Sequence, residues 1–121
     1  MEVIAGDRCT GKTTKLAQWV LEDIKKHAIV VRHRDQKERI INEFAIPKTN
    51  VFDISDIKYG HHRGNSWYYA IDDAEYVLAQ VTELTGRIAY IAITANTILY
   101  REEETTVEFY EERTKLANYN G

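Results

Sequence analysis

The stretch from Gly6 to Thr13 constrains this chain more than any other part of its sequence. It reads Gly-Asp-Arg-Cys-Thr-Gly-Lys-Thr and matches the spacing G-x-x-x-x-G-K-[ST] in full. Residues 3–5 form an apolar run before it, and residues 13–26 repeat apolar side chains at about every fourth position. A loop with this pattern, set between a buried strand and a helix, predicts a site that binds phosphate groups.

Each fixed position of this loop has a chemical reason. Gly6 and Gly11 allow tight turns and a close approach of the backbone to phosphate oxygens. The N–H groups of the loop and of the following helix form a concave anion site. We expect Lys12 to reach the β- and γ-phosphates and the Thr13 hydroxyl to ligate Mg²⁺. The expected nucleotide-binding residues are Gly6, Asp7, Arg8, Cys9, Thr10, Gly11, Lys12, Thr13 and Thr14.

A second signal follows the apolar run at residues 68–71, where Asp72 and Asp73 stand side by side. An acid at the carboxyl end of a parallel strand projects into the crevice that the phosphate loop also faces. We therefore predict that Asp72 holds Mg²⁺ opposite Thr13. The alternative is that an aspartate here only caps the next helix.

These two motifs resemble those of the P-loop NTPase superfamily, over residues 3 to about 96. Residues 71–75 read Ile-Asp-Asp-Ala-Glu. This string resembles the Walker B motif of the division with a catalytic glutamate, which includes helicases, viral DNA-packaging motors and AAA-type ATPases. It is also similar to the motif of cellular-type thymidine kinases. The resemblance implies a P-loop NTPase fold that binds ATP and Mg²⁺.

Asp73 occupies the position of the family's catalytic glutamate. An aspartate is one methylene shorter, and a misplacement of about 1 Å can lower a rate on the order of 100-fold. We expect Lys12 to stabilise charge on the transferred phosphoryl group and Asp73 to orient water, with slow turnover. Glu75 is an alternative for the second role, and a helix N-cap is an alternative role for Asp73.

Two further segments supply candidate catalytic residues. Asn96 follows the apolar run at residues 88–93, so we expect it or Thr94 to sense the γ-phosphate or position water, with an ordinary turn as the alternative. Loop 58–64 mixes basic, aromatic and glycine residues. It can contact DNA or RNA, form a substrate lid, or place Arg63 near the γ-phosphate as an arginine finger. A solvated loop is its alternative reading.

The order of the apolar and amphipathic segments predicts an α/β fold. Four apolar runs predict strands at residues 3–5, 28–31, 67–71 and 88–93. The segments between them predict helices over residues 13–26, from the capping residue Asp35 to before Pro47, and from Ala74 to a stop at Gly86. We expect a three-layer α/β/α sandwich around a mostly parallel sheet of four or five strands. Residues 51–54 predict a short edge strand.

The chain has 121 residues, which fits a single domain, 1–121, with a core at 1–100. The acidic tail, 101–121, is expected to pack on this core or to lie at its periphery. Within the tail, the alternation of Val107 and Phe109 suits an edge strand, and a helix is the alternative. The net charge of −3 argues against coating nucleic acid by overall attraction and leaves room for a local basic patch.

Cys9 is the only cysteine, which excludes an intrachain disulfide and favours a reducing compartment. The sequence shows neither a signal-peptide pattern nor an apolar run of about 20 residues. We therefore expect a cytoplasmic protein that does not span a membrane. A homo-oligomer is a further expectation, because many members of the family complete their sites with an arginine from a neighbouring subunit.

The leading functional hypothesis is a small Mg²⁺-dependent ATPase. By analogy with the division that it resembles, it serves nucleic-acid metabolism, with a virus as one setting. ATP is favoured because no guanine-reading Asn-Lys-x-Asp motif is present. Two alternatives stay open: a nucleoside or nucleotide kinase of the thymidine-kinase type, and a non-catalytic module gated by nucleotide. The kinase alternative lacks the zinc-binding cysteines that those kinases carry.

Overall fold

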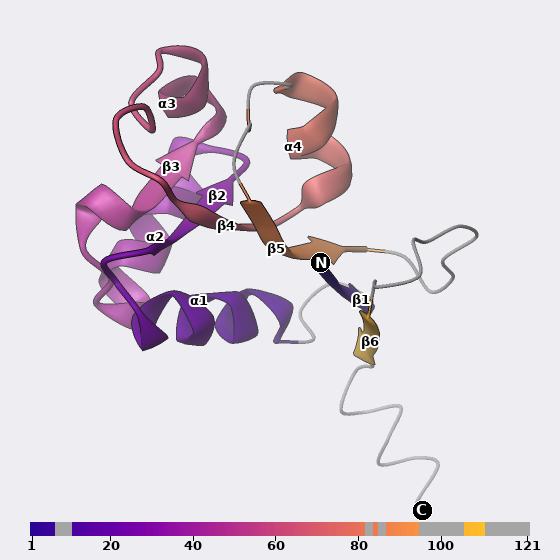
Figure 1. Ribbon diagram of the computed structural model, residues 1–121. Coiled ribbons are helices and arrows are strands. Elements are labelled where there is room, and N and C mark those ends of the chain that lie inside the picture. The colour runs from indigo at the N-terminus through magenta and orange to yellow at the C-terminus, as the bar shows by residue number, and fades with distance from the viewer. Residues whose placement is uncertain (7–10, 82–83, 85–86, 95–105, 111–121) are drawn as a thin grey trace, which may run out of the picture.

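The computed structural model describes residues 1–6, 11–81, 84, 87–94 and 106–110. Within these ranges the strands form one sheet in the order β3-β2-β4-β5-β1-β6 (Figure 1). The strands are β1 (Glu2–Gly6), β2 (His27–Val31), β3 (Val51–Asp53), β4 (Tyr68–Ile71), β5 (Arg87–Ile93) and β6 (Thr106–Tyr110). The helices are α1 (Lys12–Glu22), α2 (Arg34–Phe44), α3 (Ile54–Lys58) and α4 (Ala74–Gln80), with a 3₁₀ turn at Lys48–Asn50.

All neighbouring strands run parallel, which confirms the α/β prediction. Within the described residues the sheet already has six strands, so the expected number of four or five was too low. The additional strand comes from the tail, where β6 pairs with β1 in a register that joins Glu2 to Thr106. The edge-strand interpretation is therefore right for Thr106–Tyr110, and the helical alternative is wrong there.

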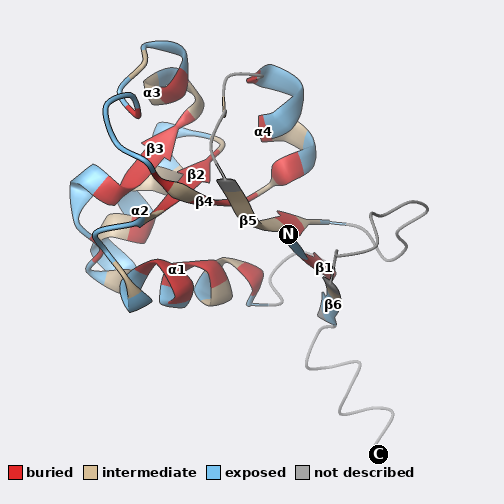
Figure 2. Ribbon diagram, in the orientation of Figure 1, coloured by how far each residue is buried: buried red, intermediate tan, exposed pale blue. Residues whose placement is uncertain are grey.

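Helices cover both faces of the sheet, and each face has its own apolar core. Alternate residues of β2 point to opposite sides, so Ile29 and Val31 join one core while Ala28 and Val30 join the other. The first core contains α1 and α2 residues, and the second contains α3 and α4 residues. Figure 2 shows the buried positions concentrated on the central strands and on the helix surfaces that face them. The protein is therefore a three-layer α/β/α structure.

Strand β5 lies between β4 and β1, as expected for the longest apolar run. The strand that ends in the phosphate-loop motif and the strand that ends in the aspartate pair are therefore separated by one strand. Because all strands are parallel, their carboxyl ends meet at one edge of the sheet, where ligands bind in open α/β sheets. This edge brings together the starts of α1, α2 and α4.

Several element boundaries differ from the predicted ones. Helix α1 ends at Glu22 rather than at residue 26, because Asp23 leaves the helical conformation with a φ of −154°. Helix α2 begins at Arg34, so the predicted cap at Asp35 is wrong. The Gln36 side chain accepts hydrogen bonds from the backbone N–H groups of Arg32 and His33 at 3.1 and 3.2 Å, which satisfies donors at the start of the helix.

Helix α3 was not predicted. Its first turn is closed by reciprocal hydrogen bonds: the Asp56 backbone N–H donates to Asp53 Oδ1 at 2.8 Å, and the Asp53 N–H donates to Asp56 Oδ2 at 3.0 Å. Helix α4 ends at Gln80, before the predicted stop at Gly86, which lies outside the described residues. None of the helices in the described ranges combines the length and apolar character that crossing a bilayer requires.

Candidate active site

The turn between β1 and α1 depends on glycine at Gly11. Its φ of 89° lies in the left-handed region, which side-chain-bearing residues rarely adopt. No described atom lies within 4 Å of a Cβ added there, so backbone conformation rather than space requires the glycine. The middle of the predicted phosphate loop lies outside the described residues, so the roles of Asp7, Arg8, Cys9 and Thr10 stay predictions.

Among the described residues, no side chain caps the N-terminus of α1. Gly11 occupies the cap position and has no side chain to accept hydrogen bonds from the first backbone N–H groups. The helix has 11 residues, so its dipole adds positive potential at this end. The N–H groups at the start of a helix, together with this dipole, favour an anion.

Lys12 turns its ammonium group back onto the loop. The side chain is buried, and Nζ donates a hydrogen bond of 2.9 Å to the carbonyl oxygen of Gly6. This contact joins the first residue of α1 to the last residue of β1. It holds a positive charge at the start of α1.

Thr13 and Asp72 meet across the site although 59 positions separate them in the chain. The Thr13 hydroxyl donates to Asp72 Oδ2 at 2.9 Å, and the backbone N–H of Asp73 donates to Asp72 Oδ1 at 3.1 Å. Burial raises the pKa of the Asp72 carboxyl group above its usual value. Hydrogen bonds from Thr13 and Asp73 partly oppose this rise by favouring the charged form.

These two oxygen donors suit Mg²⁺, which binds carboxylate and hydroxyl oxygens and commonly takes its remaining ligands from water and phosphate. The pair therefore fits the predicted metal site through the chemistry of its donors. It lies beside the Lys12 ammonium, on the wall of the same cavity.

The phosphate-site cavity is defined here as a hollow of about 540 Å³ at this edge of the sheet. Its volume falls in the range of small-molecule sites. The described lining residues are Gly11, Lys12, Thr13, Thr14, Arg32, Gln36, Arg39, Asp72, Asp73, Ala92 and Thr94. The structure thus brings the two sequence motifs to one cavity.

Asp73 has the cap position of α4 but does not use its side chain as a cap. Its backbone is left-handed, with a φ of 53°, and its carboxylate lies 3.4 Å from Arg32 Nη1. The Arg32 guanidinium in turn stacks over the Tyr76 ring, 3.7 Å from the ring centre. Asp73, Arg32 and Tyr76 therefore form a chain of contacts that leads away from the phosphate-site cavity.

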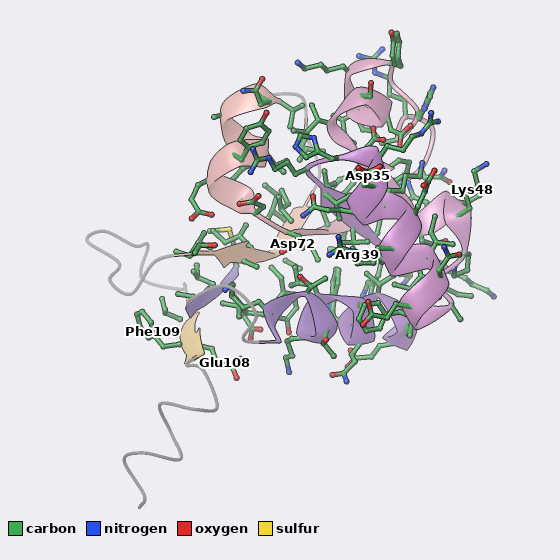
Figure 3. The ribbon with its side chains drawn as sticks, turned by 180° about the vertical axis from the view of Figure 1, so that it is seen from behind. Asp35, Arg39, Lys48, Asp72, Glu108 and Phe109 are labelled. Atoms are coloured by element: carbon green, nitrogen blue, oxygen red, sulfur yellow. The ribbon has the colours of Figure 1, made fainter. Side chains whose placement is uncertain are left out.

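Sequence reasoning missed the two arginines in this cavity. Arg32 directly follows β2, so the strand-end rule that identified Asp72 also applies to it. Arg39 is exposed on the second turn of α2 and reaches the cavity because that helix packs on β2 and β3, on the face of the sheet that α1 also covers. Figure 3 shows Arg39 and Asp72 from behind the view of Figure 1.

The remaining candidates lie elsewhere. Glu75 is exposed and accepts a hydrogen bond of 2.8 Å from the Thr94 backbone N–H, which ties α4 to the end of β5. Asn96 lies outside the described residues. Arg63 lies in the turn after α3, where its N–H donates to the Gly60 carbonyl at 3.0 Å, and it is not among the described residues that line the phosphate-site cavity.

A second hollow lies beside the first one. This side pocket measures about 550 Å³ and is lined by residues of the β2–α2 turn, α3, the turn after it, and α4. Arg32 lines both cavities. Part of loop 58–64 contributes to the side pocket through Lys58, Tyr59 and His61.

Comparisons of the chain with protein-family models, curated proteins and solved structures found no significant match.

Proposed function

We propose that this protein binds Mg·ATP at the carboxyl edge of its sheet and hydrolyses it, as a small ATPase that serves nucleic-acid metabolism. The observation that carries the proposal is the hydrogen bond between Thr13 and Asp72. It joins the phosphate-loop motif to the strand-end aspartate beside Lys12 and the N-terminus of α1. Two independent sequence signals for one chemistry thus meet at one place.

Each side chain of the site has a separate role in binding or hydrolysing the nucleotide. Lys12 and the first N–H groups of α1 bind the phosphates, and Thr13 with Asp72 holds Mg²⁺. When bound, the metal neutralises charge on the phosphate oxygens. Asp73, on the same cavity wall, orients the attacking water and accepts its proton.

Arg32 and Arg39 supply positive charge from within the same chain. Both line the phosphate-site cavity, and cations aimed at the phosphoryl group stabilise the charge that develops during its transfer. Arg39 is exposed and has freedom to approach a bound nucleotide. These two arginines therefore take the role that the sequence had suggested for Arg63.

Phosphate release from Mg·ATP tests the proposal. The parent protein is compared with Lys12→Ala and with Lys25→Ala, a control at an exposed lysine in the turn after α1. We expect Lys12→Ala to lose ATP binding and turnover and Lys25→Ala to retain both. Absence of ATP binding by the parent protein, or full turnover by Lys12→Ala, would refute the proposed function.

A nucleoside or nucleotide kinase is the second candidate, because the side pocket adjoins the phosphate-site cavity and has room for an acceptor. Phosphate transfer that appears only when a nucleoside or nucleotide is added would favour this candidate. ATP binding without any turnover would instead favour a non-catalytic, nucleotide-gated module.

A further inference from the structure

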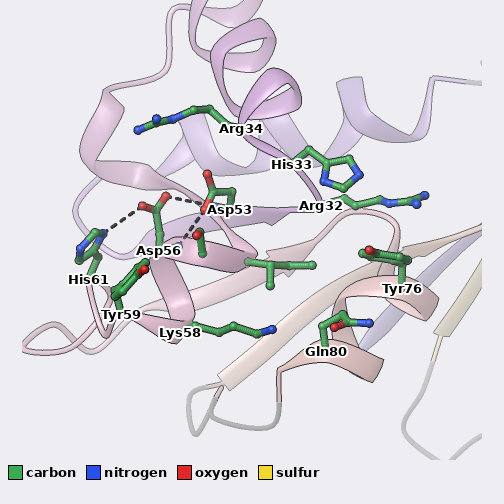
Figure 4. A pocket seen from close by; sticks show the side chains of 12 residues that line it. Arg32, His33, Arg34, Asp53, Asp56, Lys58, Tyr59, His61, Tyr76 and Gln80 are labelled. Atoms are coloured by element: carbon green, nitrogen blue, oxygen red, sulfur yellow. Dashed lines mark hydrogen bonds and ion pairs between the residues drawn. The ribbon is translucent and has the colours of Figure 1, made fainter.

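The side pocket joins aromatic surface to positive charge at the carboxyl ends of β2 and β3. Figure 4 shows Tyr59 and His61 on one side of it, with Arg32, His33 and Tyr76 on the other. The pocket opens to solvent beside Tyr59, a residue that is 78% exposed. Among the described residues that line the pocket, Tyr59 is the only large hydrophobic one that is exposed.

The rings of the side pocket are arranged for stacking. Tyr59 lies nearly parallel to His61, with ring centres 6.1 Å apart and planes 24° apart. On the opposite wall, Tyr76 meets His33 edge-on at 5.9 Å and carries the Arg32 guanidinium over its face. The outer face of Tyr59 is thus presented to a flat, aromatic ligand group.

The two aspartates of the pocket are already engaged by the protein. Asp56 Oδ2 accepts from Lys37 Nζ at 2.7 Å, and its Oδ1 contacts His61 Nδ1 at 3.0 Å. Burial raises the pKa of Asp56, but these hydrogen bonds outweigh burial and leave it below the usual value. Asp53 closes the first turn of α3. Lys37 therefore compensates the charge of Asp56, whereas the Asp53 carboxylate accepts only a backbone N–H among the described contacts.

Arg34 and Lys58 differ from Arg32, the other arginine of this pocket, which pairs with Asp73. Among the described residues, neither Arg34 nor Lys58 has an ion-pair partner. Figure 4 shows Lys58 extending from α3 across the pocket toward the side where Tyr76 and Gln80 lie. Two available cations beside an exposed ring match a phosphate next to an aromatic base.

We propose that the side pocket binds a nucleotide unit of a single-stranded nucleic acid, with a base stacked on Tyr59 and the adjoining phosphates paired with Arg34 and Lys58. This inference deepens the proposed role in nucleic-acid metabolism by placing the nucleic acid beside the phosphate-site cavity. The net charge of −3 gives no general attraction, so the affinity depends on this local cluster. An open pocket suits a single-stranded nucleic acid, because the nucleic acid continues on both sides of the nucleotide that is bound.

The test measures binding of a fluorescent oligothymidylate to the intact protein by anisotropy at low salt. We expect Tyr59→Ala to weaken binding by about 5- to 100-fold, as for loss of one stacked base, and Tyr59→Phe to retain it. The slope of log affinity against log salt concentration is negative for such binding. We expect Arg34→Ala and Lys58→Ala each to make it less steep by about 0.7. Melting curves monitored by circular dichroism verify that these variants are folded.

Two controls match these variants. Lys48→Ala removes an exposed lysine that precedes β3 and so lies at the opposite edge of the sheet. Phe109→Ala removes an exposed aromatic ring on β6. We expect both to bind like the parent protein. No oligonucleotide binding at low salt, or equal losses in these controls, would overturn the proposal.

Two further experiments distinguish this proposal from free-nucleotide binding and from the ATPase proposal. Thymidine monophosphate that competes as strongly as the oligonucleotide would assign the pocket to a free nucleotide and overturn the single-strand assignment. Lys12→Ala should keep oligonucleotide binding while losing ATP, and Tyr59→Ala should do the reverse. If only the side-pocket proposal fails, Tyr59→Ala leaves oligonucleotide binding unchanged while Lys12→Ala still loses ATP. If only the ATP proposal fails, Lys12→Ala leaves ATP binding unchanged while Tyr59→Ala still weakens oligonucleotide binding.

Discussion

Asp73 combines an unfavourable backbone with a side chain that its helix does not use. Its left-handed conformation costs a residue other than glycine on the order of 1–3 kcal/mol. The carboxylate faces Arg32 in the phosphate-site cavity rather than the N–H groups of α4. Such strain is retained where the surrounding structure holds a side chain for a task. We propose that this task is orientation of the attacking water.

Replacement of Asp73 by asparagine separates the charge from the conformation. Asparagine tolerates the left-handed region, so the turn into α4 should persist. Because the amide cannot accept a proton from water, we expect phosphate release to fall by about 10²- to 10⁴-fold while Mg·ATP binding remains. Asp35→Asn, an exposed aspartate in the first turn of α2, is the matched control. Unchanged turnover in Asp73→Asn would assign the water to another group.

The candidate site residues that could be predicted from the sequence are those that belong to a local sequence pattern. Gly11, Lys12 and Thr13 belong to one continuous motif, and Asp72 stands directly after an apolar strand. Arg39 could not be predicted in this way. It reaches the phosphate-site cavity through the packing of α2, and nothing in the neighbouring sequence distinguishes it from a solvated arginine.

Among the elements, α3 shows why short helices escape sequence analysis. It has five residues, too few for an apolar stripe to repeat. Its capping pair consists of Asp53 and Asp56, whereas the usual signal has glutamate or glutamine at the second position. Strand β6 was ambiguous for a different reason: only its pairing with β1 distinguishes it from a helix.

The charge of Asp56 should stabilise α3 and the wall of the side pocket. Its carboxylate is largely buried, bonds Lys37 and accepts from the Asp53 backbone. We expect Asp56→Asn to lower the free energy of unfolding at neutral pH by about 1–3 kcal/mol, as for loss of a hydrogen bond to a charged group. Chemical denaturation measures this difference, with Asp35→Asn as the control.

The same variant has a defined pH dependence. The folded-state pKa of Asp56 lies below the usual 3.8, so its charge stabilises the folded protein fully above that value. The stabilisation is lost as the pH falls through the lower pKa of the folded state. The parent protein and Asp56→Asn should therefore converge in stability on acidification below 3.8. A constant difference across this range would show that the carboxylate charge is not its cause.

For the whole molecule, the notable feature is that two cavities share one edge of the sheet and one residue. Arg32 lines both, and its guanidinium contacts the Asp73 carboxylate through Nη1 and lies over the Tyr76 ring. A bound phosphate group adds negative charge near Asp73. It should draw the guanidinium away from Tyr76 and leave that ring free to stack. Nucleotide binding in one cavity should therefore strengthen nucleic-acid binding in the other.

This coupling is measurable as a ratio. We expect a non-hydrolysable ATP analogue with Mg²⁺ to tighten oligothymidylate binding about fivefold, the lower end of typical coupling between sites. By linkage, the oligonucleotide must tighten binding of the analogue by the same factor, which is an internal check. The ratio compares the oligothymidylate affinity with the analogue bound to the affinity without it. In Arg32→Ala this ratio should fall to about one, even where the substitution changes the affinity for the oligonucleotide or for the analogue. A ratio in Arg32→Ala equal to that of the parent protein would show that another part of the sheet edge joins the two cavities.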